Sequence, residues 1–336
     1  MALGLLLPAA ASAHGPVDPA ASSYLARIAT APPGTVAKVI DGDQRMSLRA
    51  NPAETLVVLD YRGAPYLRFS PAGVQVNRSS SMYYLNQVPA QIPPPRLQPA
   101  TPPRWSTVSR AHQYSWHDGR LHALASTARA PGTTYLGHWR VPVRVNGSLA
   151  AIGGGLFYAE PPSIVWFWPI VVVVACVLAV VRLRRSQLDL AVARGLAAVA
   201  LAGFVVAGAG RQLHGRPTVS AGQLIVLGLV LAFAVWALRR LVQRRHGWFT
   251  FFLVAVAAIW QGATLVTVLL DGFVLVDLPP FLARAVVVAC LAAGAGLLVL
   301  VFRMAERPGP AAAVPTAGRP EPEDELDFDD EHAWEV

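Results

Sequence analysis

Histidines are the residues of this sequence whose type and spacing indicate chemistry. His117 and His122 flank the dipeptide Asp118-Gly119. An Asp-Gly dipeptide between alternating residues is typical of a two-residue type I′ hairpin turn. We expect that turn to place both histidines on one face, as diagonal neighbours with Cβ atoms roughly 7–8 Å apart or less. Two imidazoles at that separation can meet one metal ion through bonds of about 2 Å, so the spacing predicts a metal-binding pair.

Two more histidines lie in the same region. His138 falls in an expected strand over 134–145 and can line the same polar face as the pair. His112 falls on the opposite, apolar face of the expected hairpin, where a core or edge position is expected. A second interpretation of His117 and His122 stays open, because histidines on the outer face of a hairpin are often only solvated polar residues.

The start of the chain offers a further nitrogen ligand. Residues 1–13, MALGLLLPAAASA, are apolar and end in Ala11-Ser12-Ala13, which is typical of a signal peptide and its cleavage site. Cleavage there makes His14 the first residue of the mature chain. A terminal histidine can bind a metal through its amino group and ring Nδ1 together, and with another imidazole it forms a histidine brace, which suits copper. We therefore expect a copper site with these candidate ligands: His14, His117, His122 and His138.

Strands are expected to position these histidines. Short runs of β-branched and aromatic residues alternate with turn residues between positions 36 and 158. This pattern predicts an all-β extracytoplasmic domain over 14–162, an immunoglobulin-like or cupredoxin-like sandwich. The strands are expected at 36–41, 45–49, 55–61, 66–69, 73–77, 105–109, 113–117, 120–125, 134–145 and 150–158. Asp41-Gly42-Asp43 is expected to form a turn, and Gly153-Gly154-Gly155 a bulge or turn.

Hydrophobicity is concentrated in the second half of the chain. Of the 336 residues, 54% are hydrophobic and 14% charged, and the mean hydropathy is +0.43. This composition excludes a wholly soluble enzyme and a disordered protein. Five stretches are long and apolar enough to cross about 30 Å of hydrocarbon: 163–181, 190–210, 221–238, 248–270 and 281–302. The sequence thus predicts an α-helical membrane domain of five spans over 163–302.

Arginine placement predicts the orientation of these spans. The connecting segments 182–194 and 239–247 are rich in arginine, whereas the other two hold only Arg211 and Arg216. The positive-inside rule places the arginine-rich segments in the cytoplasm. With five spans, 14–162 then lies outside the cytoplasmic membrane of a bacterium, and 303–336 lies in the cytoplasm.

The C-terminal segment and the overall charge bear on partners. Nine of the twenty acidic residues follow Pro320, in a segment rich in proline and alanine, so 303–336 is expected to be an acidic, disordered cytoplasmic tail. The formal net charge is +8, yet no basic run is interleaved with aromatic residues as single-stranded nucleic-acid sites require. We expect the lipid bilayer as a partner and no nucleic acid.

The layout of the chain resembles a known class of proteins. A small-x-small site followed at once by His14, then an exported β-sandwich and several helices, is similar to the histidine-brace copper proteins, including the CopC and YcnI classes. The resemblance covers the layout and residues 11–14, and it implies a copper ligand at His14 alone, because Asp118-Gly119-Arg120 stands where CopC has Asp-Gly-His. Residues 59–86, 116–118 and 162–168 also resemble uncharacterised five-helix membrane proteins of bacteria.

These observations lead to one hypothesis and two alternatives. The chain is expected to be a membrane-anchored extracytoplasmic copper-binding protein that holds or transfers copper, with a copper transporter or an envelope protein as partner, and not an enzyme. The first alternative is a structural or sensory membrane protein whose sandwich binds a protein or cell-envelope partner without metal. The second is an oxidative enzyme that uses the same brace.

Overall fold

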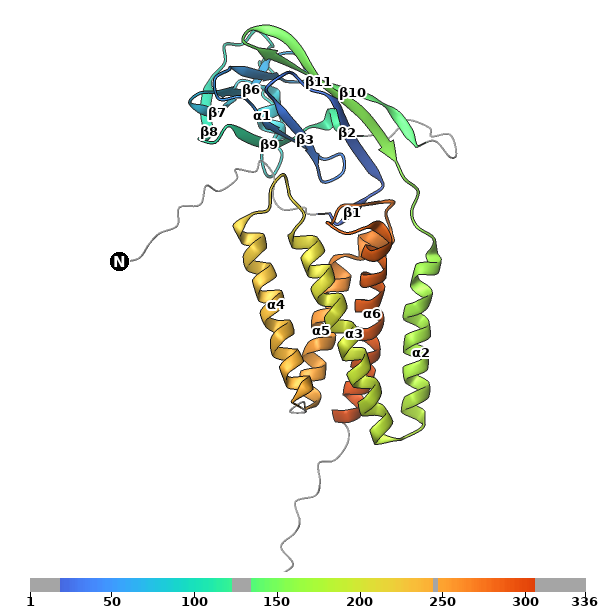
Figure 1. The fold of residues 1–336 in the computed structure, drawn as a ribbon. Helices are drawn as coiled ribbons and strands as arrows, with labels where there is room; N and C mark the ends of the chain where they lie inside the picture. Colours follow the sequence, from blue (N-terminus) through green and yellow to red (C-terminus); the bar gives the residue numbers. More distant parts are fainter. Residues whose placement is uncertain (1–18, 123–133, 244–246, 306–336) are drawn as a thin grey trace, which may run out of the picture.

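Two antiparallel β-sheets stand at one end of a bundle of helices (Figure 1). The computed structural model describes residues 19–122, 134–243 and 247–305. The larger sheet has seven strands in the order β2-β11-β10-β5-β6-β7-β8. Its strands are β2 (Tyr24–Thr30), β5 (Leu56–Leu59), β6 (Pro65–Ser70), β7 (Gly73–Asn77), β8 (Trp105–Ser109), β10 (Tyr135–Val145) and β11 (Ser148–Tyr158). The smaller sheet has the order β3-β4-β9, with β3 (Val36–Ile40), β4 (Arg45–Arg49) and β9 (Gln113–His117).

Both sheets contribute side chains to one apolar core. Met46 of β4 and Trp116 of β9 come from the smaller sheet, and Val58 of β5 and Val141 of β10 come from the larger one; all four are fully buried. Burial of an apolar side chain of this size stabilises a fold by roughly 1.5–3 kcal/mol. The expected order of an all-β region followed by helices is therefore confirmed.

Most strands begin and end close to the predicted positions, and β4, β7, β8 and β9 match them residue for residue. Strand β2 of the larger sheet was not predicted: it precedes the first expected strand and lies at the edge of that sheet, where it pairs with β11. Its partner residues are far away in the sequence, as in the pair Leu25 and Phe157. Short-range pattern alone does not reveal such a pairing.

The glycine run in β11 forms a bulge, as predicted. The register against β2 shifts between Gly153 and Gly154. A Cβ atom at Gly154 would overlap the carbonyl oxygen of Arg27 and the ring of Trp139. Glycine is therefore required where β2 and the Trp139 ring approach the backbone most closely.

The helical part contains four helices that are long and apolar enough to cross a membrane. They are η2 with α2 (Ile164–Phe167 and Trp168–Arg182), α3 (Ser186–Gln212), α4 (Ala221–Val242) and α6 (Pro280–Ala305). A fifth apolar helix, α5 (Trp248–Thr264), is shorter and continues into the 3-10 helix η3 (Val266–Leu269). The short helix α1 (Ser81–Leu85) belongs to the sheet region.

Helix α6 occupies the centre of the bundle. It contacts α2, α3 and α5, and small side chains allow the approach: a Cβ at Gly294 would meet Ile259 of α5, and one at Gly203 of α3 would meet Cys290. Helix α4 lies at the edge, where it contacts α3 and, less extensively, α5. The ends of α2 and α4 at Arg182 and Val242 lie at the end of the bundle far from the sheets (Figure 1).

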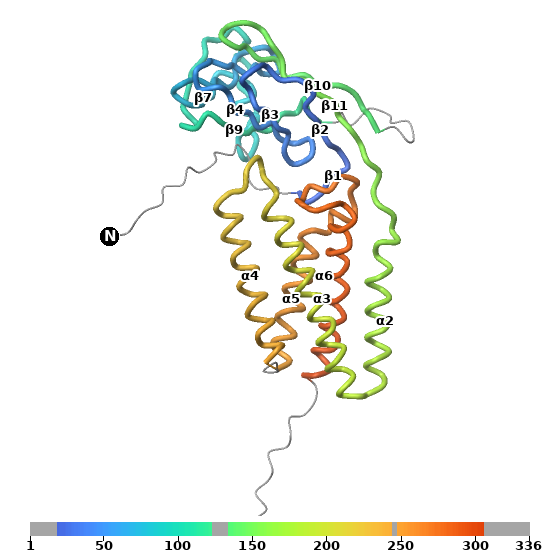
Figure 2. Tube along the Cα trace, in the orientation of Figure 1, coloured from blue at the N-terminus to red at the C-terminus, as the bar shows by residue number. Residues whose placement is uncertain are grey.

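Backbone pairing joins the first described residues to a loop of the bundle. The two-residue strand β1 (Ala21–Ser22) pairs with β12 (Phe273–Val274), which lies in the α5–α6 connection. Ser23 Oγ donates a hydrogen bond of 2.9 Å to Asp271 Oδ1. Figure 2 shows β1 where the sheets meet the helices. The sheet region is thus connected to the bundle at β1 as well as through the β11–α2 segment.

An ion pair forms a second contact between the two parts. Asp41 in the β3–β4 turn lies 3.4 Å from Arg216 in the α3–α4 loop, and both side chains are largely buried. Arg216 also donates a hydrogen bond of 3.1 Å to the carbonyl oxygen of Pro19. The β3–β4 turn, the N-terminal segment and the α3–α4 loop therefore meet at one place.

Candidate metal site

The hairpin predicted at Asp118-Gly119 is wrong. Asp118 has φ −133° and ψ 106° and is the N-cap of a 3-10 helix, η1 (Gly119–Leu121), whereas a type I′ turn needs positive φ at both central residues. Strand β9 pairs with β4, where Arg45 is the partner of His117. The strand expected over 120–125 is wrong for 120–122, and 123–125 lie outside the described residues.

The carboxylate of Asp118 explains the 3-10 turn. Asp118 is fully buried. It accepts hydrogen bonds from Trp116 Nε1 at 2.9 Å, from Arg120 Nε at 2.8 Å and Nη2 at 2.7 Å, and from the backbone N–H of Arg120 at 3.1 Å. Because these donors lie on both sides of Asp118 in the sequence, they hold the chain in a tight turn directly after β9. A buried charge of this kind is stable only when it is paired and hydrogen-bonded.

This turn brings His122 back to the end of β9. The Nε2 atoms of His117 and His122 lie 3.3 Å apart, and the ring centroids lie 4.8 Å apart. Both residues are half-buried. The two histidines are therefore neighbours as expected, but through the 3-10 turn and not through a two-stranded hairpin.

A buried carboxylate lies behind the second histidine. Asp43 Oδ2 is 3.2 Å from Nδ1 of His122, and Gln44 Nε2 donates a hydrogen bond of 3.1 Å to Asp43 Oδ1. Asp43 is 4% exposed. A carboxylate at Nδ1 favours the tautomer with the proton on that nitrogen, which leaves the Nε2 lone pair of His122 directed toward His117.

Asp43 was missed as a site residue, since Asp41-Gly42-Asp43 was interpreted only as a turn. The turn itself is confirmed: Asp41 and Gly42 have φ of 59° and 81°, so this Asp-Gly dipeptide has the left-handed conformation that we expected at Asp118-Gly119. A Cβ at Gly42 would lie 2.8 Å from the carbonyl oxygen of Tyr24. This close approach fixes the turn and, with it, the position of Asp43.

Two backbone hydrogen bonds hold the chain at His117 and at Gly119. The His117 N–H donates a hydrogen bond of 3.0 Å to Oδ1 of the buried Asn86, and the Gly119 N–H donates one of 2.8 Å to the hydroxyl of Tyr61. Burial raises the pKa of Tyr61, and the carboxylate of Asp118 raises it further. Tyr61 is therefore a neutral phenol at pH 7 that accepts a hydrogen bond, and not a phenolate ligand.

The other histidines have surroundings of their own or lie outside the described residues. His138 is exposed on β10, in a shallow depression that also includes Thr30 of β2 and Gly153 of β11. His112 lies 3.2 Å through Nδ1 from the carbonyl oxygen of Ser70. His14 and the predicted signal peptide 1–13 lie outside the described residues, as do residues 306–336 of the expected tail.

The pair supplies two ring nitrogens to a common point. In the described parts of the chain, no group of three or more His, Cys, Asp or Glu side chains is arranged to hold a metal ion. Asp43 does not act as a third ligand, because it contacts the opposite nitrogen of the His122 ring. A metal at the pair would need a further donor from elsewhere or from solvent.

Comparisons of the chain with protein-family models, with curated proteins and with solved structures found no match. The functional inference therefore depends on the residues of the chain itself.

Proposed function

We propose that the chain is a membrane-anchored protein whose sheet region binds copper at His117 and His122, and that it holds or transfers the ion. The observation that supports this best is the Nε2–Nε2 distance of 3.3 Å. Two nitrogens bound to one ion at about 2.0–2.1 Å with a tetrahedral angle are about 3.3 Å apart. The two rings thus already have the separation that a shared ion requires.

Asp43 supports a metal role over a solvated surface pair. Metal-binding histidines commonly donate their other ring N–H to a carboxylate, which orients the ring and makes its free nitrogen more basic. The contact between Asp43 and His122 has this arrangement. A solvated histidine pair would not need a buried carboxylate in that position.

The donor set favours copper, with His14 as the proposed third residue. Imidazole and amine nitrogens suit copper, and both cysteines of the chain, Cys176 and Cys290, lie in the helices. The carbonyl oxygen of Pro19 accepts a hydrogen bond from Arg216, which also pairs with Asp41. Asp41 lies two residues before Asp43 in the sequence. The five residue steps from Pro19 to His14 span at most about 17 Å, and the proposal brings His14 to the pair once cleavage exposes it.

The setting of the site is part of the same proposal. The sheet region is proposed to be an immunoglobulin-like or cupredoxin-like sandwich outside the cytoplasmic membrane of a bacterium. Helix α5 with η3 is proposed as the fifth span, and the tail is then cytoplasmic. Support comes from the arginine-rich helix ends, which lie at the end of the bundle opposite the sheets (Figure 1).

The test uses the full chain, produced in bacterial membranes and purified in mild detergent. Copper content and affinity are measured for the native chain and for His117→Ala, His122→Ala and His138→Ala. We expect each substitution in the pair to weaken copper binding at least tenfold, and the exposed His138→Ala to match the native chain. Equal copper affinity in all four proteins would overturn the proposed site.

Two further measurements test the proposed brace. N-terminal sequencing of the purified protein should give His14 as the first residue, and one residue added before His14 should remove its amine ligand and weaken copper binding. A different first residue, or unchanged copper affinity after the addition, would show that His14 is not a ligand. The proposal for His117 and His122 is tested separately by their own substitutions.

The contact between the sheets and the bundle favours a second candidate function, a sensory protein without metal. A partner or cell-envelope component bound to the sheets would act on the helices through Asp41 and Arg216 and through the β1–β12 pairing. A chain that binds no copper but retains an envelope component through purification would support this alternative.

A further inference from the structure

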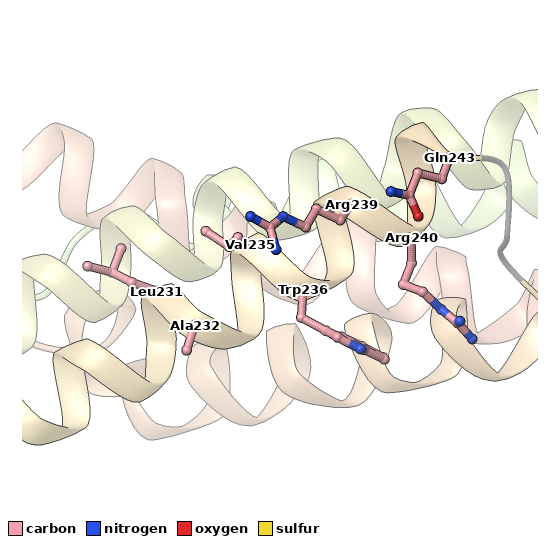
Figure 3. A pocket seen from close by; sticks show the side chains of 7 residues that line it. All are labelled: Leu231, Ala232, Val235, Trp236, Arg239, Arg240 and Gln243. Carbon is pink, nitrogen blue, oxygen red and sulfur yellow. The ribbon is translucent and has the colours of Figure 1, made fainter.

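A shallow groove runs along the C-terminal half of α4 (Figure 3), toward the end of the bundle far from the sheets (Figure 1). One side of the groove is the row Leu231, Val235, Arg239 and Gln243, whose members are four residues apart. The parallel row consists of Ala232, Trp236 and Arg240. Residues four apart lie one above another on a helix, so each row has two apolar side chains followed by an arginine, and the first row continues to Gln243.

The groove lies on a helix face that the bundle leaves uncovered. Only Val230 and Ala237 of α4 are buried, while Leu231 is 44% exposed and Val235 49% exposed. This face is apolar and lies on a helix of sufficient length and hydropathy to cross a membrane. Hydrocarbon chains of lipid are therefore its expected surroundings.

Arg239 and Arg240 make the C-terminal end of the groove positively charged. Arg239 and Arg240 are both exposed, and no carboxylate in the described residues is within ion-pair distance of either. By contrast, Arg303 at the same end of the bundle is paired with Asp189 at 3.2 Å. The guanidinium of Arg240 lies 6.0 Å from the ring centre of Trp236, and Trp is enriched where a membrane helix reaches the headgroups.

The length of α4 places these arginines at headgroup depth. Its 22 residues span about 33 Å, against about 30 Å for the hydrocarbon core. Arg239 and Arg240 lie in the last turn, so this turn lies close to the level of the lipid phosphates. Leu231, two turns earlier, lies about 12 Å deeper.

From this arrangement we propose that the groove is a binding site for an anionic phospholipid. The headgroup lies at the charged end of the groove, where Arg239, Arg240 and Gln243 supply donors, and one acyl chain follows Leu231 and Val235. Net negative charge on the headgroup is the recognised feature, since a zwitterionic lipid carries its own cation and gains less from two arginines. This site is independent of metal binding in the sheet region.

The test measures lipid retention by the full chain. The protein is reconstituted in bilayers of equal parts phosphatidylglycerol and phosphatidylcholine, transferred to mild detergent, and examined by native mass spectrometry for bound lipid. We expect the native chain to retain phosphatidylglycerol in preference to phosphatidylcholine. Equal retention of the two lipids would overturn the proposal.

Matched variants distinguish lipid binding in the groove from a general effect of positive charge. The double substitution R239Q/R240Q should lower phosphatidylglycerol affinity about tenfold or more, while R239K/R240K should keep most of it. The control R182Q/R185Q removes two arginines at the same end of the bundle and outside the groove, and it should behave as the native chain. Equal losses in R239Q/R240Q and R182Q/R185Q would overturn the site.

A steric variant tests the groove without a change of charge. Ala232→Phe adds a ring at the apolar end of the groove and should displace the lipid while both arginines remain. The lipid-facing position of Ala232 permits the larger side chain, so this variant decides the question even if R239Q/R240Q does not fold. Retention at the native level in Ala232→Phe would overturn the position proposed for the acyl chain.

Discussion

Oδ2 of Asp43 lies 3.2 Å from Nδ1 of His122, while Nε2 of the same ring lies 3.3 Å from His117. The imidazole of His122 thus has a carboxylate at one nitrogen and a second imidazole at the other. These three residues come from two separate segments, the β3–β4 turn and the chain that follows β9. The site therefore forms only when the smaller sheet is folded.

Substitution of Asp43 should weaken metal binding although Asp43 binds no metal. Asp43→Asn removes the charge that orients His122, and loss of such a partner typically lowers metal affinity about 10–100-fold. Copper affinity of the full chain, measured by competition with a chelator, checks this. Glu54→Gln, a carboxylate substitution elsewhere in the sheet region, is the control. A native affinity in Asp43→Asn would show that the contact does not support the site.

Substitution of Asp118 should destabilise the sheet region. Asp118→Ala leaves the buried donors of Trp116 and Arg120 without their shared acceptor, and breaking a buried ion pair costs about 3–5 kcal/mol. The free energy of unfolding in urea measures the effect. The exposed Arg110→Ala is the control and should stay within about 0.5 kcal/mol of the native chain. A similar stability in both variants would contradict the role given to Asp118.

Removal of Arg216 should loosen the contact between the sheets and the bundle. Arg216→Gln removes the Arg216 ion pair of Asp41 and leaves the one with Arg45, 3.6 Å away, and loss of a contact to a charged group costs about 1.5–3 kcal/mol. Local opening should then make the amides of β1 and β12 exchange hydrogen roughly ten- to hundredfold faster. Arg211→Gln, in the last turn of α3, where Arg211 donates a hydrogen bond to the carbonyl oxygen of Thr264, is the control. Unchanged exchange at β1 in Arg216→Gln would show that the pairing holds without the ion pair.

High pH should unfold the sheet region through its buried tyrosines. Burial raises the pKa of Tyr66 well above its usual value, and the neighbouring Tyr114 and Asp118 add to the effect. A group with a raised pKa in the folded state contributes its full stability below its unfolded pKa of about 10, and this contribution is lost as the pH rises further. Tyr66→Phe should therefore move the alkaline unfolding midpoint, followed by near-ultraviolet circular dichroism, to higher pH. The exposed Tyr135→Phe should leave it in place, and a shift of equal size in both variants would contradict the role of burial.

The sequence was a good guide to strands whose pattern is local. The segments 45–49, 73–77, 105–109 and 113–117 were predicted with their observed bounds. Period-two alternation of apolar residues is visible in 45–49, 73–77 and 113–117, and 105–109 is rich in residues that favour strands. Strand β2 was missed because its position depends on a distant partner, β11. The helix expected over 248–270 was also predicted imperfectly. Its apolar residues continue past Thr264, but α5 ends there and η3 follows.

The candidate site was only partly predictable for a related reason. The neighbouring positions of His117 and His122 were expected, but the expected hairpin was wrong because the carboxylate of Asp118 binds Trp116 and Arg120 instead of facing solvent. Asp43 could not be assigned, since the sequence does not show that the β3–β4 turn lies beside the chain after β9. A side chain that acts through tertiary contacts leaves no spacing signal in the sequence.

The pairing of β1 with β12 has a mechanical consequence. The sheet region is fastened at its first strand through β12 and at its last strand through the segment that enters α2. A body on a single tether can swivel, but one fastened at two points resists torque about either attachment. The pair of His117 and His122 is therefore held in one orientation relative to the helix ends.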